Sequence, residues 1–382
     1  KGLISVETID ADRNPAVVRK YDTNDEGISN GSIVFENGGK IMTVSQFDIY
    51  ILNDYALGKT FNGEQQFTGA IIRVTSDELP TVYFLEGHGE PDINVDLSRL
   101  AARIETEAHI VKSLNLQKEG SIPKDAGCLI VAFPKTDLSN DEKELMRAYL
   151  FEGGRAIILF DILSQEDQMA NFNGLLKFYG IQYANNFVVE ESSQNLYSGN
   201  KMYLIPQYNI QHDIVRKLNT DRLFVLMPFA SSLEILSDRD RTINAEPLLL
   251  SSEKSWIRYN LEDATATQTQ DDVSGPAMLA VAISRNNADL RHEDTRIVVT
   301  GDAGFVDNEF VDIQGNFNLF LNALHWAEDR GDAITIRPKT MNTNILYVQG
   351  DLYNVVLIVS VLVLPLLAFL TGLIVWLRRR HL

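Results

Sequence analysis

Residues 126–161 read AGCLIVAFPKTDLSNDEKELMRAYLFEGGRAIILFD, with two short apolar runs on either side of one amphipathic segment. The first run, Cys128–Phe133, is apolar throughout and predicts a strand that is buried on both faces. Ser139 and Glu142 have the spacing of a capping box, which predicts a helix over Leu138–Phe151. A strand, a helix and a second apolar run in this order are typical of a parallel sheet covered by helices.

The same alternation of strands and helices continues on both sides of that stretch. Further strands are expected at Val82–Leu85, Ala156–Phe160, Ala277–Ile283 and Ile297–Thr300, and further helices at Leu97–His109, Met169–Tyr179 and Asn316–Ala327. A last short strand is expected at 334–336. The sequence therefore predicts an α/β fold of the flavodoxin-like kind, with a largely parallel sheet and helices on both faces.

Residues 1–78 predict a small α+β region that precedes the α/β domain. Two short apolar runs flank the Asn-Gly-Gly sequence at 37–39, which is a hairpin signal. Residues 66–74 predict a short helix, and we expect its Ala70 and Ile71 to face inward.

Residues 79–345 are predicted to form the α/β domain. An irregular insertion interrupts it at about 184–250, where strand and helix patterns are short and mixed. Residues 261–274 are polar and acidic, and we expect a mobile loop there.

The C-terminal region, 351–382, contains the run Val355–Leu377, VVLIVSVLVLPLLAFLTGLIVWL, which has no charged residue. A helix rising about 1.5 Å per residue would cross the roughly 30 Å hydrocarbon core of a bilayer over this length. Pro365 and Gly372 are tolerated inside membrane helices, and Trp376 stands near one end, where interfacial aromatic residues occur. We therefore expect one transmembrane helix.

The residues next to this run predict its orientation. Arg378, Arg379 and Arg380 follow it directly, and basic residues flank membrane helices on the cytoplasmic side. Residues 1–350 would then lie outside the cytoplasm, which predicts a location at the bacterial cytoplasmic membrane.

The charge of the chain is strongly acidic, with 34 Lys+Arg against 52 Asp+Glu and a formal net charge of −18. Region 351–382 has one Asp and three Arg, a net charge of +2, so the remaining 350 residues carry −20. This balance argues against a nucleic-acid partner, because neutralising phosphates requires surplus Lys and Arg. The single cysteine, Cys128, excludes an internal disulfide framework and a Cys-rich zinc site.

The loop at 86–92, EGHGEPD, is the first candidate site because it follows a predicted parallel strand, at the edge where open α/β sheets bind ligands. His88, Gly89, Glu90 and Asp92 are its candidate ligand- or partner-binding residues. His88 and the carboxylates suit metal binding or proton transfer, but no second histidine stands at metal spacing, so no metal site is predicted. The alternative is a tight glycine turn in which His88 bonds locally.

A second candidate site contains Asp302 and Asn308, in a polar, turn-rich stretch after another predicted strand. A cation or sugar site is one interpretation, and helix capping with turn formation is the other. Cys128 opens an apolar run and does not follow a strand on a sharp turn, so we expect a core cysteine and no nucleophile. The chain has no phosphate-binding loop of the ATPase type, and we expect no cofactor and no catalytic residue.

Several segments together resemble the auxiliary components of ABC transporters, typified by the gliding-motility protein GldG. They are FTGAIIRVTSDELPTVYFLEGHGE (67–90), the stretch quoted for 126–161, SGPAMLAVAISR (274–285), RIVVTGDAGFVDNEF (296–310) and GNFNLFLNALHWAED (315–329). The family's α/β domain is similar to a domain of intraflagellar transport proteins and to amidotransferase-like sheets that lack catalytic residues. Family members commonly have an N-terminal span as well, and the present chain begins at Lys1.

The resemblance implies a non-enzymatic subunit that works with a separate ABC permease and, mainly through it, an ABC ATPase. The extracytoplasmic domain would act in assembly, gating or cargo contact, with or without homodimer formation. Two other functions remain open from the sequence. One is a membrane-anchored receptor for a sugar, a peptide or an envelope polymer. The other is an anchored hydrolase built on His88, Glu90, Asp92 or Asp302.

Overall fold

The structure is a computed structural model. It describes residues 4–22, 27–53, 58–163, 169–262, 265–286, 294–329, 339–340 and 359–380. The chain divides into two compact units. The first contains residues 1–49 and 63–337, and the second contains residues 50–62 and 338–382.

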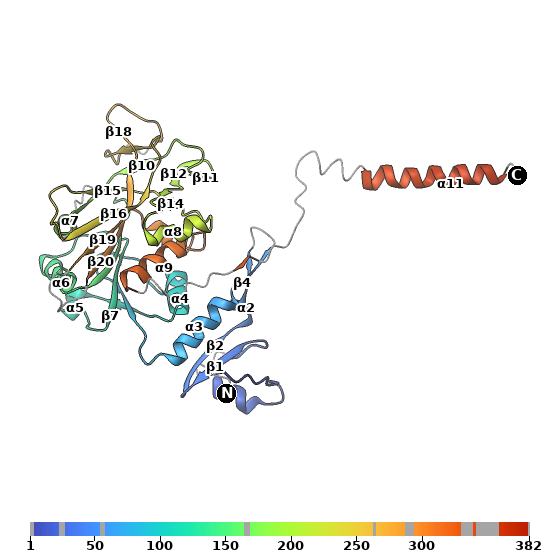
Figure 1. Cartoon of the computed structure of the whole chain (residues 1–382), viewed down its shortest axis with the longest axis horizontal. Coiled ribbons are helices and arrows are strands. Elements are labelled where there is room, and N and C mark those ends of the chain that lie inside the picture. The colour runs from blue at the N-terminus through green and yellow to red at the C-terminus, as the bar shows by residue number, and fades with distance from the viewer. Residues whose placement is uncertain are drawn as a thin grey trace. The chain divides into compact units, whose positions relative to one another are not determined.

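A ten-stranded sheet runs through the first unit (Figure 1). Its strands follow the order β13-β16-β19-β20-β8-β7-β5-β6, with β15 paired to β19 and β9 paired to β15. Their bounds are β5 Thr81–Leu85, β6 Ile110–Leu114, β7 Ala126–Ala132, β8 Arg155–Leu159, β9 Ile181–Ala184, β13 Gln207–Tyr208, β15 Ser232–Ile235, β16 Ile243–Leu250, β19 Met278–Arg285 and β20 Thr295–Thr300. The strands β6, β5, β7, β8 and β20 run parallel, which confirms the predicted parallel sheet for this half. From β20 through β19 to β16 and β13 the pairing is antiparallel.

Helices cover both faces of the parallel half, as predicted (Figure 1). Their bounds are α4 Ser98–Thr106, α5 Leu116–Glu119, α6 Asn140–Phe151, α7 Ala170–Phe178, α8 Asp213–Thr220 and α9 Asn316–Ala327. Alternate side chains of β5 enter two different cores because successive residues of a strand point to opposite faces. Val82 and Phe84 pack with α4 and α9, whereas Tyr83 and Leu85 pack with α6 and α7.

The expected capping box fixes the start of α6. The Glu142 backbone N–H donates to Ser139 Oγ at 3.3 Å, and the Ser139 N–H donates to Glu142 Oε2 at 2.9 Å. After the helix, Gly153 has φ of 94°, a conformation that glycine adopts without strain. The strand β8 begins two residues later, so the local signals in 126–161 set both ends of the connection.

The small N-terminal region contains α1 (Pro15–Tyr21), β1 (Ile33–Asn37), β2 (Lys40–Val44), α2 (Gln46–Ile49) and α3 (Gly63–Thr75). The strands β1 and β2 form the predicted antiparallel hairpin, with Asn37 opposite Lys40. On α3, Ala70 is 2% exposed as expected, but the inward orientation expected for Ile71 is wrong, because Ile71 is 38% exposed. The buried stripe of α3 runs through Gly69, Ala70 and Val74, which turns Ile71 toward its margin.

Residues 187–274 form two small sheets beside the main one, and the expected insertion at about 184–250 also contributes β13, β15 and β16 to the main sheet. The strands are β10 Phe187–Val189, β17 Trp256–Arg258 and β18 Val273–Ser274 in one, and β11 Leu196–Tyr197, β12 Asn200–Leu204 and β14 Met227–Pro228 in the other. Arg258 holds the described part of the 261–274 loop. Its guanidinium donates to the carbonyls of Thr265 at 2.6 Å and Thr267 at 2.7 Å and pairs with Asp272 at 2.8 Å.

The second unit contains the strands β3 (Tyr50–Asn53), β4 (Gly58–Phe61) and β21 (Lys339–Thr340), which pair antiparallel in the order β21-β4-β3. A π-helical turn, η2 (Val359–Val363), leads into α11 (Leu364–Arg380). Over the residues that the structure describes, no helix combines the length and the apolar character needed to cross a membrane. The strand expected at 334–336 and the start of the apolar run at Val355 lie outside the described residues.

Candidate functional site

The 86–92 loop connects the carboxyl end of β5 to the segment that precedes α4. Gly87 and Gly89 have φ of 122° and 82°, a region that side-chain-bearing residues rarely adopt. A Cβ on Gly89 would also stand 3.0 Å from the Lys135 Cβ, so the loop passes close to the segment after β7. These two glycines therefore make the tight strand-to-helix turn that the sequence left as one interpretation.

His88 is the buried centre of this loop, with 2% of its surface exposed. Its Nδ1 lies 3.0 Å from Glu90 Oε1, and its backbone N–H donates to Glu90 Oε2 at 2.6 Å. On the other side, His88 Nε2 makes an ion-pair contact at 3.2 Å with Glu142 Oε1, without hydrogen-bond alignment. The His88 carbonyl accepts the backbone N–H groups of Lys135 and Thr136. His88 therefore ties the β5–α4 loop to the β7–α6 connection.

The two carboxylates control the protonation of His88. Burial alone would lower the His88 pKa, but the hydrogen bond and charge of Glu90, together with Glu142, outweigh it and raise the pKa above 6.5. Burial opposes ionisation of Glu142 too, yet the hydrogen bonds from Ser139 and the charge of His88 lower its pKa. At pH values below this raised pKa, the arrangement is a buried imidazolium beside Glu90 and Glu142.

The exposed residues of the loop are Glu86, Gly87, Gly89 and Asp92. Asp92 Oδ1 accepts the backbone N–H of Asn94 at 2.7 Å and thereby shapes the turn before α4. The structure thus divides the predicted residues into an inner pair, His88 and Glu90, and an outer surface around Asp92.

Asn308 joins the second predicted loop to the same region. Its Oδ1 accepts the backbone N–H of Arg99 at 3.0 Å, and its Nδ2 donates to the Val95 carbonyl at 2.8 Å and to Ser98 Oγ at 3.1 Å. The loop after β20 is therefore fastened to the start of α4. Asn308 thus contacts the segment that follows the 86–92 loop and not the loop itself, and the structure does not pair Asp302 with His88.

Asp302 is fully buried at the carboxyl end of β20. Its Oδ1 accepts the Gly304 N–H at 2.9 Å, whereas its Oδ2 has no hydrogen-bond partner. Burial, followed by the charge of Asp161, raises the pKa of Asp302 well above its ordinary range. Burial also raises the pKa values of Asp161 and Asp307. No group of His, Cys, Asp and Glu side chains within the described ranges has the geometry of a metal site.

The chain itself covers the edge of the sheet beside Asp302. The backbone N–H of Ser231 donates to the Gly301 carbonyl at 2.7 Å, and Ser231 Oγ donates to the Asn186 carbonyl at 2.8 Å. A Cβ on Gly301 would stand only 2.0 Å from the Ser231 carbonyl oxygen. The insertion therefore packs directly on the turn after β20, where a ligand crevice opens in other sheets of this class.

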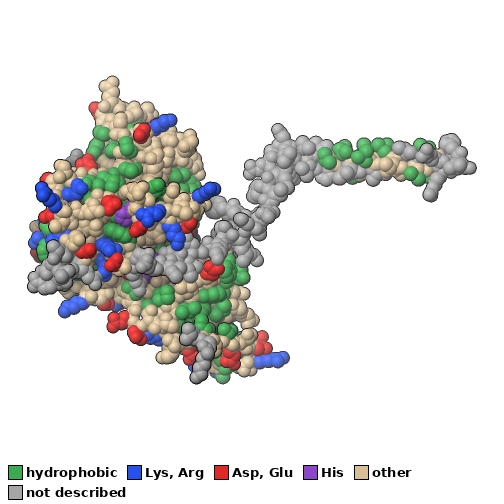
Figure 2. Space-filling view, in the orientation of Figure 1, with side chains coloured by type: hydrophobic (Ala, Val, Ile, Leu, Met, Phe, Trp, Pro, Cys, Tyr) green, Lys and Arg blue, Asp and Glu red, His purple; other side chains and the backbone are tan. Residues whose placement is uncertain are grey.

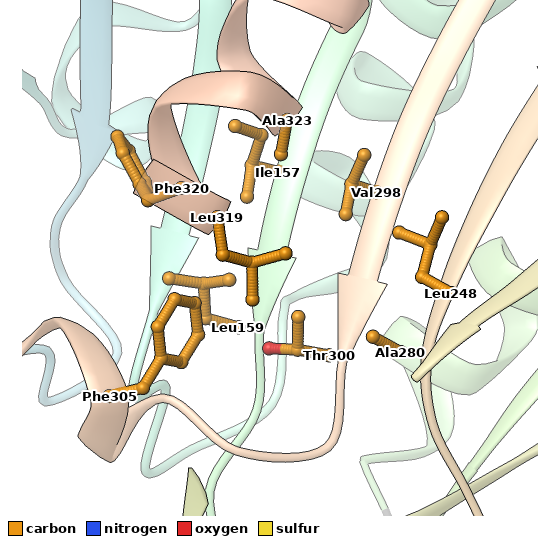
Figure 3. A pocket seen from close by; sticks show the side chains of 10 residues that line it. All are labelled: Ile157, Leu159, Leu248, Ala280, Val298, Thr300, Phe305, Leu319, Phe320 and Ala323. Atoms are coloured by element: carbon orange, nitrogen blue, oxygen red, sulfur yellow. The ribbon is translucent and has the colours of Figure 1, made fainter. Parts of the chain in front are cut away.

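A small apolar cavity of about 10 Å³ lies between the sheet and α9 (Figure 3). It is lined by Ile157, Leu159, Leu248, Ala280, Val298, Thr300, Phe305, Leu319, Phe320 and Ala323. A space of this size holds roughly one water molecule. The cavity is a packing defect of the core and is too small for a substrate.

Cys128 is fully buried in β7, and burial raises its thiol pKa well above the ordinary value. The expected core cysteine is confirmed. Two residues of the site were not recognised from the sequence in their present roles. The sequence pattern predicts Glu142 as a helix cap but not as the second partner of His88, and it assigns no role to Asp161. The contacts of both side chains depend on which strands are neighbours.

Comparisons with known proteins place this geometry in a family. Three solved structures show similarity: the mmIFT52 N-terminal domain (18% identity, 65% of this chain and 97% of that chain, TM-score 0.48), a ThuA-like protein from Parabacteroides merdae (11%, 66% and 90%, 0.39) and a protein from Thermoplasma acidophilum described as part of a GMP synthase (7%, 67% and 98%, 0.32). No curated protein matches the sequence. The family model described as an ABC-type uncharacterized transport system matches residues 79–329. The chain therefore belongs to this family of ABC-type transport components.

Proposed function

We propose that this chain is a non-enzymatic, membrane-anchored auxiliary subunit of an ABC transporter complex. The observation that carries the proposal is the family match over 79–329, which spans the whole parallel sheet and the helices on both of its faces. In this proposal the domain acts outside the cytoplasm in assembly or gating, with a separate permease and a separate ATPase as partners.

The geometry at the sheet edge supports a role without catalysis. The insertion packs on Gly301, and His88 is enclosed between Glu90 and Glu142, so His88, Glu90 and Asp302 face the interior and only Asp92 of the four candidates is exposed. An acid–base catalyst must come within hydrogen-bond reach of its substrate. For the same reason the geometry favours a transporter subunit over an anchored hydrolase built on these residues.

The proposed partner contact is the outward side of the 86–92 loop, with Glu86 and Asp92 as its exposed charges. His88 and Glu90 act there as positioning residues, because they hold the loop against α6 from the inside, and Asn308 holds the start of α4, which follows the loop. Loops that carry function on a rigid scaffold are commonly held in this way.

The proposed anchor is the apolar run Val355–Leu377, with Arg378–Arg380 at its cytoplasmic end and the bacterial cytoplasmic membrane as its location. Its support is the sequence: an uncharged run of bilayer length followed at once by three arginines. Pro365 and Gly372 are the positions where the helix would approach the permease most closely.

Purification of the full chain from mild-detergent extracts of its own membranes tests the proposal. We expect an ABC ATPase and a multi-span permease to co-purify at a fixed ratio. Asp92→Arg should reduce their recovery severalfold, whereas Asp271→Arg, at another exposed acidic residue far along the chain, should not. If native protein, even after chemical cross-linking in the membrane, brings down neither partner, the proposed function is wrong.

A further inference from the structure

His88, Glu90 and Glu142 form a buried cluster of ionisable groups, the His88 triad. Their side chains are 2%, 3% and 3% exposed. Side chains of both charges are interspersed over the molecular face shown in Figure 2, and water and salt screen such exposed charges. Burial removes this screening. A change of one unit of charge inside the triad therefore affects its surroundings far more than the same change at the surface.

The elements packed around the triad bring no other charge to the imidazole. Within the described residues, the two glutamates of the triad supply the charges that act on it. The β7–α6 connection approaches with the backbone N–H of Lys135, whose own charge acts on Asp161. Asp137 of this connection accepts two backbone N–H groups at the start of α7, and α7 presents the ring of Phe172, with the ring centroids 6.4 Å apart. The proton of the imidazole is thus the adjustable charge of the triad.

The two ring nitrogens of His88 face different carboxylates. Nδ1 lies 3.0 Å from Glu90 Oε1 in hydrogen-bond geometry, and Nε2 lies 3.2 Å from Glu142 Oε1. Neither Nε2 nor this Oε1 has a hydrogen-bond partner in the part of the chain that the structure describes. A protonated imidazole has an N–H on both nitrogens, whereas a neutral one has a single N–H and a lone pair. Only the protonated ring therefore attracts both carboxylates.

The contact with Glu142 is the one that loss of a proton breaks. Glu90 has an aligned bond to Nδ1 and also accepts the His88 backbone N–H at 2.6 Å, so the remaining proton stays on Nδ1. The lone pair of Nε2 then faces the Glu142 carboxylate and repels it. The capping box of α6 holds Glu142 in place, whereas the loop has a glycine on each side of His88. The loop therefore yields before the helix does.

We propose that the proton on His88 Nε2 is a switch for the outward side of the 86–92 loop. With the proton, the triad holds the loop against α6 and presents Glu86 and Asp92 in one arrangement. Without it, the side chain of His88 leaves α6, the loop loosens and the partner contact weakens, so binding is stronger on the acid side. The effect on binding rests on the proposed transport role, whereas the movement of the loop does not.

The mobility of a spin label on the full chain in detergent tests the movement. A nitroxide is attached at Glu86→Cys, an exposed position of the loop, and the native Cys128 is buried. Between about pH 6 and about pH 9 we expect the mobility of the label to increase, with a midpoint above pH 6.5, because the two glutamates raise the pKa of His88. A label at Ser237→Cys, exposed in the turn after β15, should show no such change.

Two conservative variants of the labelled chain separate a switch from a purely structural role. His88→Gln keeps a donor and an acceptor but does not titrate, so the mobility of the label should not depend on pH. Glu142→Gln keeps an oxygen for the helix cap and removes one charge, so the midpoint should fall by about one pH unit or more. A midpoint that Glu142→Gln leaves unchanged overturns the proposal, as does a native loop whose mobility is constant over this pH range.

Co-purification of the unlabelled chain distinguishes failure of the switch from failure of the transport role. Recovery of the permease and the ATPase with the native chain should fall severalfold between about pH 6 and about pH 8.5, and recovery with His88→Gln should stay constant. If neither partner is recovered at either pH while the label still titrates, the transport role is wrong and the loop movement stands. Equal recovery with the native chain at both pH values would show that the switch does not govern the contact.

Discussion

The protonation of His88 is the residue-scale feature with the clearest consequence. Because folding raises the pKa of His88 above 6.5, its contribution to stability is complete below that pH and is lost as the pH rises through the folded pKa. Folding lowers the pKa of Glu142, so the contribution of Glu142 to stability is lost only as the pH falls below 4.5. We expect His88→Gln to lower the free energy of unfolding by roughly 3 kcal/mol near pH 6 and by less near pH 8, measured by urea unfolding.

His212 provides a matched control of opposite sign. Burial lowers the pKa of His212, so this residue makes the folded protein more stable as the pH rises. It caps α8 by accepting the Ile214 N–H, a bond that Asn can replace. His212→Asn should therefore cost less near pH 6 than near pH 8. Parallel pH trends for the two histidine variants would show that His88 is not held protonated by Glu90 and Glu142.

Asp302 gives the second residue-scale prediction. Its raised pKa means that the folded state binds a proton that the unfolded state releases above about pH 4, so stability falls as the pH rises. Asp302→Asn keeps the acceptor for the Gly304 N–H and removes the buried charge. We expect the variant to be more stable than the native chain by about 1 kcal/mol or more near pH 8 and similar to it near pH 4. Denaturant titrations at both pH values test this, and a less stable variant near pH 8 would contradict it.

The residues of the site were only partly predictable from the sequence. His88, Glu90 and Asp92 stood out because they follow a strand beside two glycines. Glu142 lies more than fifty residues later, in α6, the third helix after the loop, and its contact with His88 exists only because β5 and β7 are neighbours. Asp161 approaches Asp302 for the same reason, through the pairing of β8 with β20. A local sequence pattern identifies residues such as His88 and Glu90. It carries no information about Glu142 and Asp161, whose contacts depend on strand pairing.

At the scale of elements, two glycines inside helices should respond oppositely to alanine. A Cβ on Gly69 of α3 would stand 2.1 Å from the Thr106 carbonyl oxygen at the end of α4, so Gly69→Ala must push the two helices apart. We expect it to destabilise the protein by about 2–3 kcal/mol. Gly174 of α7 is exposed, and its nearest neighbour would be Lys143 Cδ at 3.8 Å. Gly174→Ala should stabilise by up to about 1 kcal/mol, because alanine favours the helix. Thermal unfolding followed by circular dichroism measures both; equal shifts of Tm would contradict the close approach of α3 to α4.

The sequence predicts the helices and strands whose own residues carry a clear pattern, and it does not predict the others. Buried strands such as β7 and β8 read as continuous apolar runs, and α6 has its capping box. The strand β6 was missed because Ile110–Leu114 is a half-exposed edge strand and lies directly behind a helical pattern. The expected helix Leu97–His109 is instead α4, ending at Thr106. Leu97 is the N-cap of this helix, and the carboxylate of the preceding Asp96 accepts the Asp92 N–H. In β16, Glu246 and Pro247 interrupt the apolar pattern that would have identified it.

At the scale of the whole molecule, the uneven distribution of charge decides which partners the chain can meet. The first 350 residues carry −20, and the last 32 carry +2 around an uncharged run. A strongly acidic domain keeps nucleic acid and anionic lipid headgroups away by repulsion. In the proposed function the apolar run supplies the attachment to the membrane, and the net charge of the domain does not contribute to it.

Substitutions in the apolar run test that attachment directly. Leu366 and Leu370 stand one helical turn apart in α11, and both are exposed. Each aspartate in the middle of a membrane helix costs about 2.5–3.5 kcal/mol for insertion, so Leu366→Asp with Leu370→Asp should weaken anchoring by roughly 5–7 kcal/mol. We expect the doubly substituted full chain to leave the membrane fraction on alkaline carbonate extraction, whereas Leu366→Ala with Leu370→Ala stays in the pellet with the native chain. If the aspartate variant remains in the pellet like the native chain, the apolar run does not hold this protein at the membrane, and the attachment must lie elsewhere in the chain or in a partner.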